Sequence, residues 1–345
     1  MAARRSARRA KSKRQDAGTR ATGKTPAAGK QKGEQGEQKE GEDEEKAPTS
    51  WVLHRFSASS HHFNRVCTLA ALLVAVCGVA EHIQPVPYGK FGGASKNLLS
   101  IGLPAQIGWW LMELPCSAFF AYQFFAVGGP QASRPVPRFF AFLFCCHYLY
   151  RGWLFPYMLR PSSSGLKNFD VTVALGSWGV TLLHAYLNAR WYAEHGTHLA
   201  GGVNFGGKEK KNGSKKKRVE DSSNDDFAWT KDVRFRVGIA LYYAGFALTI
   251  YHDHLMRELR PCPGGARYCI PHGGLYEYVT MGGYTSELLA WLGFAIASWG
   301  PNGLFIFLVS LGNLVPRAAT SHKWYLDTFP EYAALGRAKL IPGVW

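Results

Sequence analysis

Long apolar stretches separated by short polar breaks are the feature that most constrains how this chain of 345 residues folds. Each stretch approaches the ~20 residues that an α-helix needs to cross the hydrocarbon core of a bilayer. Most are apolar on all faces, whereas the helices of a soluble protein carry a polar face. The sequence therefore predicts an all-α fold, a polytopic membrane protein with about seven transmembrane helices. The expected spans are residues 66–83, 107–127, 137–158, 170–192, 235–252, 275–299 and 300–316.

Two segments differ in composition from the rest of the chain. Residues 1–50 hold 13 Lys and Arg, 8 Asp and Glu and no aromatic residue, so we expect a disordered basic tail. Residues 66–345 are expected to form the seven-helix domain, with a polar, Lys-rich loop insert at 196–230. Neither the tail nor the basic run at 208–218 interleaves aromatic residues with its lysines, as single-strand nucleic-acid binders do. We therefore expect contact with membrane lipids and no nucleic-acid partner, and the sequence identifies no protein partner.

The sequence matches one nucleotide-binding motif, but the flanking residues do not provide the strand and helix that this motif requires. The residues "GTRATGKT" at 18–25 fit the P-loop pattern, which requires a buried strand before it and a helix after it. Polar segments flank the motif here, so we expect no phosphate-binding loop. The glycine fingerprint of a Rossmann fold is also missing, so a nicotinamide cofactor would have to be held by another architecture.

The cysteines and histidines give no strong sign of a metal. Cys262 and Cys269 share one polar loop and could form a disulfide or bind a metal with a partner, but we expect two free thiols. His252 and His254 point to opposite faces of a helix, which disfavours a shared metal ion. No metal site is therefore expected.

A single acid, Glu113, lies in the middle of the apolar stretch "GWWLMELPCSAFF" at 108–120. An ionised carboxylate in a spanning helix is costly, so this acid must be paired, face a cavity or stay protonated. It could tie two helices together, but an acid inside a membrane is by default a functional-site hypothesis. Arginines and glycines gather later, in "YHDHLMRELRPCPGGARYCIPHGGLYEYV" at 251–279. That combination favours phosphate recognition or contact with lipid headgroups.

Several ordered motifs between residues 85 and 345, outside the insert, point to a known family. They are "ELP" around Glu113, "HYLYR" at 147–151, "KDVRFRVGIALYYAGFALTIYHDHLMRELR", "YCIPHGGLYEYVT", "ELLAWLGFAIASW", "HKWYL" and the final "RAKLIPGVW". They resemble the steroid 5-alpha-reductases, and "AYLNARW" at 185–191 is similar to the plant branch of that family. The resemblance implies a multi-pass protein of the endoplasmic reticulum membrane that uses NADPH. Its reaction would reduce the carbon 4,5 double bond of a lipophilic 3-oxo-4-ene steroid.

The resemblance also implies site residues. Glu113 and Tyr148 match the pair that hydrogen-bonds the steroid 3-keto oxygen, where donors stabilise the enolate that forms when hydride adds to the enone. The apolar surroundings of Glu113 would keep it protonated and able to donate. The family's cofactor-lining or cofactor-supporting positions fall at Tyr88, Arg160, Asp253, Arg257, Arg260, Tyr268, Tyr278, Glu287, Trp291, Arg317, Tyr325 and Arg337. The chain differs from the family pattern at Thr249, Cys269, Gly283 and Ser321.

Two further interpretations stay open. Related reductases share the C-terminal motifs, so the substrate could instead be a trans-2-enoyl-CoA or a polyprenol. The chain could also be a reductase-like scaffold that has lost catalysis and makes contacts through its basic tail. Glu113 and Tyr148 argue against the scaffold, whereas the differences at Thr249, Cys269 and Gly283 argue for it.

Overall fold

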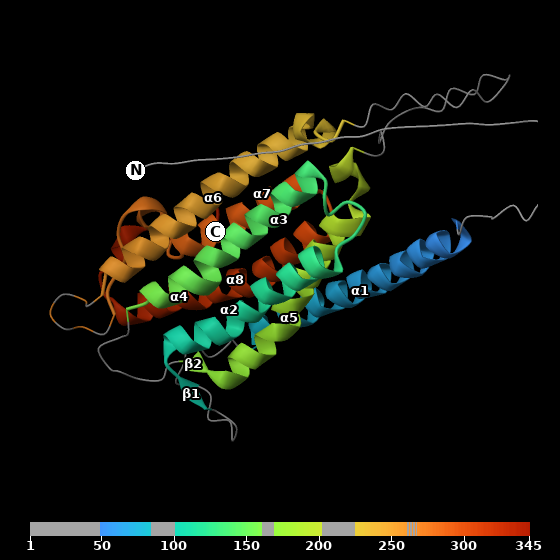
Figure 1. Cartoon of the computed structure of the whole chain (residues 1–345). Helices are drawn as coiled ribbons and strands as arrows, with labels where there is room; N and C mark the ends of the chain where they lie inside the picture. The colour runs from blue at the N-terminus through green and yellow to red at the C-terminus, as the bar shows by residue number, and fades with distance from the viewer. Residues whose placement is uncertain are drawn as a thin grey trace, which may run out of the picture. The chain divides into compact units, whose positions relative to one another are not determined.

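The computed structural model describes residues 49–83, 101–160, 169–201, 225–260, 262, 264, 266 and 268–345. These residues are mostly helical (Figure 1). The α-helices are α1 (Thr49–Ile83), α2 (Ala105–Ala121), α3 (Pro135–Tyr148), α4 (Phe155–Met158), α5 (Val171–Arg190), α6 (Val233–Glu258), α7 (Gly282–Ser298) and α8 (Pro301–Thr328). π-Helical turns extend α2, α3 and α5, at Tyr122–Val127, Leu149–Leu154 and Trp191–His195. The expected disordered tail, apart from its last two residues, and the basic run at 208–218 lie outside the described residues.

The helical fold expected from the apolar stretches is confirmed, because each stretch contains a described helix. By length and composition, three helices of the described part can cross a membrane: Ser60–Ala80 within α1, the whole of α6, and the whole of α8. Helices α2 and α3 have 17 and 14 residues before their π-helical turns begin. The described chain is therefore that of a helical membrane protein.

Several helix boundaries differ from the sequence prediction; α1, for example, begins at Thr49 rather than at residue 66. Helix α7 begins at Gly282 rather than at residue 275, because Gly273 and Gly274 adopt positive φ angles of 93° and 55° and turn the chain first. Helix α8 continues beyond the expected end at residue 316 to Thr328, with Pro316 inside it. The backbone hydrogen-bonding pattern therefore continues where the hydropathy of the sequence falls.

A short antiparallel sheet, which the sequence did not predict, joins the segments before α2 and α5. Strand β1 (Gly102–Leu103) pairs with β2 (Phe169–Asp170). The Asp170 carboxylate then accepts a hydrogen bond from the Thr172 backbone N–H at 2.8 Å and caps α5. Two residues per strand are too few to produce a period-2 hydropathy pattern, so this sheet leaves no sequence signal.

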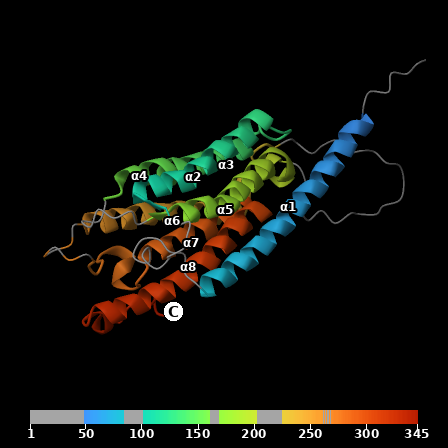
Figure 2. The same cartoon turned by 90° about the horizontal axis from the view of Figure 1, so that it is seen from below.

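Helices α6 and α7 lie side by side (Figures 1 and 2) and meet through glycines that bring their backbones together. A Cβ atom on Gly245 would stand 2.3 Å from the backbone nitrogen of Ala290. A Cβ atom on Gly238 would stand 2.4 Å from that of Ala297. Small residues at such a contact let membrane helices approach closely enough for extensive van der Waals packing.

Aromatic rings fill the space between α2, α3 and α5. Phe120 stacks on Phe144 with ring centroids 4.0 Å apart, and Phe140 stacks on Tyr192 at 5.2 Å. All four side chains are almost fully buried. This core fixes the orientation of α3, which carries Tyr148, relative to α2, which carries Glu113.

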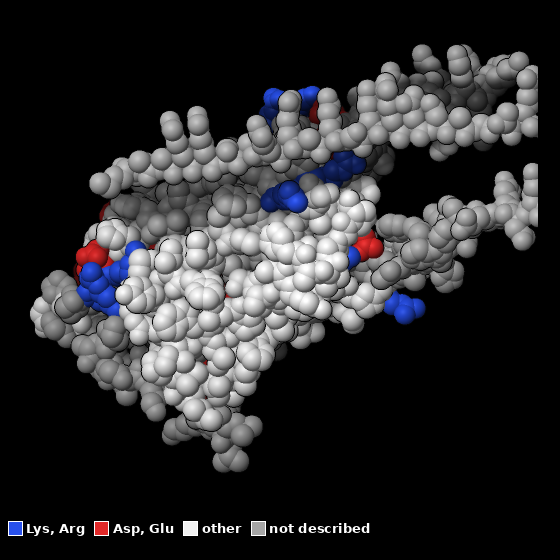
Figure 3. All heavy atoms as spheres, viewed as in Figure 1, with Lys and Arg blue, Asp and Glu red and all other residues white. Residues whose placement is uncertain are grey.

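The outer surface is apolar where a water-soluble protein would be polar. Large side chains of α1 are 59 to 64% exposed: Leu69, Leu72, Val76 and Val79. The face shown in Figure 3 is largely free of charged side chains. Exposed apolar side chains of this number and size match contact with lipid.

A buried amide network links α5 to α8. The Asn302 Nδ2 group donates to Asn188 Oδ1 at 2.9 Å and to Tyr192 Oη at 3.1 Å. Asn188 in turn donates from Nδ2 to the His184 carbonyl oxygen at 2.8 Å. These hydrogen bonds are made away from water, although Asn302 Oδ1 has no partner among the described residues, and they help to fix the register between the two helices.

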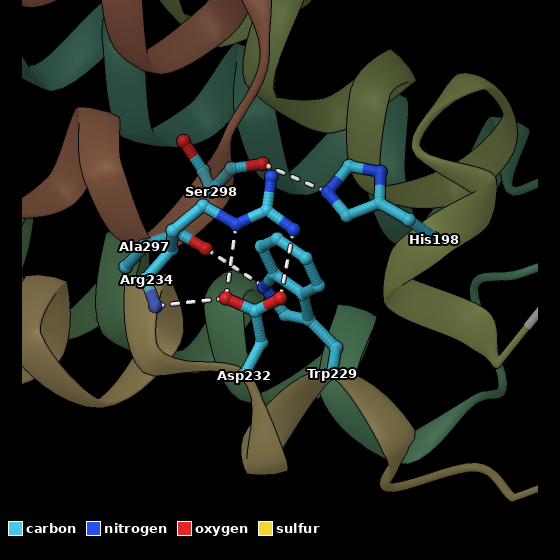
Figure 4. Close-up of polar contacts among 6 residues, drawn as sticks. All are labelled: His198, Trp229, Asp232, Arg234, Ala297 and Ser298. Atoms are coloured by element: carbon cyan, nitrogen blue, oxygen red, sulfur yellow. Dashed lines mark hydrogen bonds and ion pairs between the residues drawn. The ribbon is translucent and has the colours of Figure 1, made fainter. Parts of the chain in front are cut away.

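The N-terminal end of α6 is anchored by a cluster drawn in Figure 4. Asp232 caps the helix by accepting from the Arg234 backbone N–H at 2.8 Å, and it receives two further hydrogen bonds from the Arg234 guanidinium. These hydrogen bonds lower the pKa of the Asp232 carboxyl to about 2. The guanidinium also lies 4.7 Å from the ring centroids of Trp229 and Trp299, and Trp229 donates to the Ala297 carbonyl at 2.8 Å. The cluster thus ties the end of the loop insert to the end of α7.

The contact between α6 and α7 predicts a strong effect of a single methyl group. Gly245→Ala should lower the unfolding temperature measured in detergent, because overpacking a tight contact costs about 1–3 kcal/mol. Gly179→Ala is the matched control, since a Cβ atom there meets nothing within 4 Å, and it should leave stability unchanged or slightly raised. Equal unfolding temperatures for both variants would show that the two backbones are not in contact.

Candidate active site

One cavity of about 990 Å³ opens between the helices. Its volume is at the upper end of the ~300–1,000 Å³ typical of ligand sites. Apolar side chains line one part, including Cys77, Val173, Val180, Val309 and Leu314. Charged side chains line another part, including Arg160, Asp253, Arg257, Arg260 and Glu287. A ligand that fills this cavity would therefore have both an apolar and an anionic portion, or two ligands of those kinds would share it.

Glu113 and Tyr148, the two expected substrate-binding residues, both line the cavity. Glu113 is 8% exposed on α2 and Tyr148 is 4% exposed on α3. Trp291 of α7 also lines it. The structure therefore brings a carboxyl group and a phenol from different helices to the wall of one buried space.

Arg151 is a cavity residue that the sequence analysis did not select. Its guanidinium lies 4.0 Å from the Asp253 carboxylate and 3.6 Å from that of Glu287. It also lies 4.7 Å from the ring centroid of Trp109 and 4.8 Å from that of Phe155. The signal was present, because Arg151 belongs to the "HYLYR" motif that also carries Tyr148.

The π-helical turn Leu149–Leu154 shapes this part of the site. Within it, the Tyr150 hydroxyl donates to Asp253 Oδ2 at 2.9 Å, so that neighbouring residues Tyr150 and Arg151 both contact one carboxylate of α6. An α-helix places consecutive side chains about 100° apart, and a π-helical turn changes that angle. Such turns are frequent at functional sites.

The charged end of the cavity is closed by a contact between the segment after α4 and the end of α6. Arg160 pairs with Glu258 at 2.9 Å and donates to the backbone carbonyls of Arg257 and Arg260, each at 3.3 Å. The side chains of Arg160, Arg257 and Arg260 all line the cavity. Three guanidinium groups at one end make that end suited to an anionic group such as a phosphate.

Two other expected cofactor residues support the cavity from outside its lining. Arg317 donates from Nε to Tyr284 Oη at 3.2 Å, and Tyr284 lines the cavity. Arg337 donates from Nη1 to the Pro271 carbonyl at 2.8 Å and so holds the segment that leads to Tyr276, another lining residue. Both contacts are structural supports.

Three other expected residues, Tyr268, Tyr278 and Tyr325, lie apart from the cavity lining. Tyr268 packs edge-on against Trp324, with ring centroids 5.1 Å apart. Tyr325 is buried among the aromatic rings at the end of α8. Tyr278 is 64% exposed and lies in a shallow cleft near the C-terminus. Tyr88 lies outside the described residues.

Of the positions where the chain departs from the family pattern, some line the cavity and others do not. Thr249 and Gly283 line the cavity, whereas Ser321 is buried in α8. His252 contacts the same region through both ring nitrogens: Leu275 N–H donates to Nε2 at 3.0 Å, and Nδ1 lies 2.9 Å from the Ser286 hydroxyl. His252 therefore holds the turn before α7.

The expectation of two free thiols in the loop after α6 is wrong. Cys262 and Cys269 form a disulfide, with their Cα atoms 5.9 Å apart. The chain reverses direction in this loop and so brings the two residues into the Cα separation that a disulfide needs. Spacing in the sequence does not show such a reversal. The bond closes the loop that begins directly after Arg260.

Comparison with known proteins gives an independent view of this site. Residues 215–345 match the family of 3-oxo-5-alpha-steroid 4-dehydrogenases. The chain is 32% identical to 3-oxo-5-alpha-steroid 4-dehydrogenase 1 of Mus musculus, over 81% of this chain and 98% of that protein. It is 31% identical to the Rattus norvegicus protein of the same name, over 75% and 86%. It is 28% identical to Steroid 5-alpha-reductase DET2 of Solanum lycopersicum, over 83% and 98%.

Ionisable side chains that line a cavity within a helical bundle are the pattern of a membrane protein with a candidate functional site inside the bundle. The matches extend over most of the chain and include the motifs that carry Glu113, Tyr148 and the arginines. The chain belongs to the steroid 5-alpha-reductase (3-oxo-5-alpha-steroid 4-dehydrogenase) family.

The position of Arg151 predicts a large loss of stability when its charge is removed. Arg151→Met should lower the free energy of unfolding by about 1–3 kcal/mol, because the Asp253 and Glu287 carboxylates, whose side chains are only 18% and 22% exposed, lose their counter-charge. Arg160→Met is the control: its partner Glu258 is 52% exposed, so the change should cost at most about 1 kcal/mol. Denaturation in detergent measures both, and equal losses would contradict the role given to Arg151.

Proposed function

We propose that this chain is an NADPH-dependent oxidoreductase that reduces the carbon 4,5 double bond of a 3-oxo-4-ene steroid or sterol intermediate. One observation carries the proposal: Glu113 and Tyr148 line the same cavity as Arg160, Arg257 and Arg260. The apolar part of the cavity suits a fused-ring hydrocarbon, and the arginines suit the phosphates of a dinucleotide. The names of the relatives support the same reaction.

The residues present fit a phosphate-bearing cofactor. Among the described residues, three polar side-chain atoms are buried without a hydrogen-bond partner although their side chains line the cavity: Arg257 Nη1, Thr181 Oγ1 and Asn313 Oδ1. Buried polar atoms without partners are costly, and a bound ligand with polar groups would satisfy them. Arg160, Arg257 and Arg260 would hold the phosphates, and Trp291, which also lines the cavity, lies 4.5 Å (ring centroids) from His147, the residue before Tyr148.

The chemistry then follows from the positions of the side chains. The nicotinamide cofactor, when bound, supplies a hydride to carbon 5 of the enone. Glu113, as a protonated acid, and Tyr148 donate hydrogen bonds to the 3-keto oxygen, where negative charge develops. Both donors are fixed by packing before the substrate arrives, so little reorganisation is required during the reaction. Proton addition at carbon 4 completes the reduction.

The cellular setting belongs to the same proposal. A steroid dissolves in the bilayer, and the apolar part of the cavity includes Cys77 of α1, a helix whose outer side chains face lipid. We propose that all seven apolar stretches span the membrane and that the chain resides in the endoplasmic reticulum as a multi-pass protein.

The reaction is tested by incubating purified protein in lipid nanodiscs with NADPH and three alternative acceptors. We expect a 3-oxo-4-ene steroid to gain two mass units, and trans-2-enoyl-CoA and polyprenol to remain unchanged. Glu113→Gln and Tyr148→Phe should each lower the steroid turnover by about 10²-fold or more, the usual loss on removing one oxyanion donor. An amide is a weaker donor than a carboxylic acid, so glutamine should not replace Glu113.

Exposed counterparts provide the controls for these variants. Glu331→Gln and Tyr157→Phe make the same chemical changes at exposed positions and should keep full activity. Reduction of enoyl-CoA or polyprenol instead of the steroid would replace the proposed substrate. No reduction of any acceptor by protein that binds NADPH would support a scaffold that has lost catalysis.

The arginine end of the cavity predicts a preference between the two nicotinamide cofactors. NADPH should support turnover far better than NADH, because guanidinium groups pair with the 2′-phosphate. Arg260→Ala should raise the KM for NADPH while changing the steroid KM little. Arg138→Ala, an exposed arginine of α3, is the control and should change neither. Equal turnover with both cofactors would contradict phosphate recognition by these arginines.

A further inference from the structure

Gly283, at the start of α7, lines the cavity but contributes no side chain to it. It is one of the positions at which the chain departs from the family pattern. A Cβ atom built there would stand 3.4 Å from the Tyr276 hydroxyl oxygen and 3.9 Å from the Cβ atom of His252. Apart from the adjoining residues of α7, no other described atom lies within 4 Å of that position. The Tyr276 hydroxyl therefore borders the space that a side chain at residue 283 would fill.

Tyr276 is itself part of the cavity wall. It belongs to the 3₁₀-helix Gly274–Glu277 and is only 5% exposed. Its ring meets that of His252 edge-on, with ring centroids 5.2 Å apart and planes at 90°. Asp253 and Arg257 follow His252 on α6 and line the charged part of the cavity. Tyr276 therefore belongs to the charged part of the wall as well.

Hydrogen bonds fix the segment that carries this phenol. The Leu275 backbone N–H can only donate, so His252 Nε2, 3.0 Å away, accepts and carries no hydrogen. The hydrogen of the neutral ring is then on Nδ1, which lies 2.9 Å from the Ser286 hydroxyl oxygen. Ser286 in turn donates to the Gly282 carbonyl at 2.9 Å. Both ring nitrogens are engaged, so α6 and α7 hold the segment of Tyr276 in place before a ligand binds.

We propose that Tyr276 is a further cofactor-binding residue, whose hydroxyl takes the place of the absent side chain at Gly283 and donates a hydrogen bond to an oxygen of the phosphate-bearing cofactor. This inference rests on the proposed function, because it takes the charged part of the cavity as the cofactor site. A phenol has one hydrogen to donate, and a hydrogen bond to a charged oxygen is stronger than one between neutral groups. A tyrosine that only filled space would support cofactor binding equally well without its hydroxyl.

Direct binding measurements test this role without relying on turnover. NADP⁺, which has no hydride to donate, is titrated by calorimetry into purified protein in lipid nanodiscs. Tyr276→Phe should raise the Kd at least about tenfold, the loss expected when one hydrogen bond to a charged group is removed. The control is Tyr157→Phe, which removes the hydroxyl of a tyrosine that is 72% exposed and should leave the Kd unchanged. The ligand-free variants should unfold at similar temperatures, which separates a loss of binding from a loss of folding.

Substitutions at Gly283 test whether the hydroxyl replaces a side chain there. The backbone of Gly283 is helical, and a Cβ atom would meet its neighbours at ordinary contact distance, so other residues fit. In the Tyr276→Phe background, Gly283→Ser places a new hydroxyl beside the lost one and should recover most of the affinity for NADP⁺. Gly283→Ala adds volume without a donor and should recover none.

The outcomes separate the inference from the function on which it rests. An unchanged Kd for Tyr276→Phe, or equal recovery with serine and alanine at residue 283, would show that the hydroxyl does not bind the cofactor, whatever the reaction is. If Tyr276→Phe weakens NADP⁺ binding in a protein that reduces no steroid, the proposed reaction is wrong and the inference stands. A wild-type protein that binds no NADP⁺ would overturn both.

Discussion

The ion pairs of Arg151 with Asp253 and Glu287 are the interaction on which the site depends. They join the turn after α3 to α6 and α7, three segments that are distant in the sequence. Charges inside an apolar helical bundle are stable only when paired, so the helices that carry them must come together at this point. Arg151, Asp253 and Glu287 all line the cavity, so the ion pairs are part of its wall.

This division of the cavity explains how one space could serve two chemically different molecules. Apolar side chains from α1, α5 and α8 offer hydrocarbon contact, while Arg160, Arg257 and Arg260 offer charge at the other end. Glu113 and Tyr148 belong to helices fixed by the stacked core of Phe120 and Phe144. Rigid supports matter here, since preorganised donors stabilise developing charge without the cost of moving into place.

Much of the architecture could be predicted from the sequence because it depends on long, local patterns. The apolar stretches predicted the helices, and the isolated acid Glu113 was singled out as a candidate functional residue, which the structure places in the cavity lining. Features that depend on tertiary contact were missed. The β1–β2 sheet is too short to leave a hydropathy pattern, and the Cys262–Cys269 disulfide requires the chain to bring two separated residues together. The role of Arg151 depends on its ion pairs with carboxylates about 100 or more residues away in the sequence. Several expected cofactor residues, such as Tyr278, lie outside the cavity lining because likeness in sequence does not specify side-chain direction.

The central claim is that one cavity brings the reduced cofactor and the enone together for direct hydride transfer. Isotope tracing tests it most directly: the protein is supplied with NADPH that carries deuterium at both positions of nicotinamide carbon 4, together with a 3-oxo-4-ene steroid in ordinary water. The account predicts one deuterium in the product, located at carbon 5 by nuclear magnetic resonance, and ordinary hydrogen added at carbon 4. A reduced steroid without deuterium, or with deuterium at carbon 4, would contradict it.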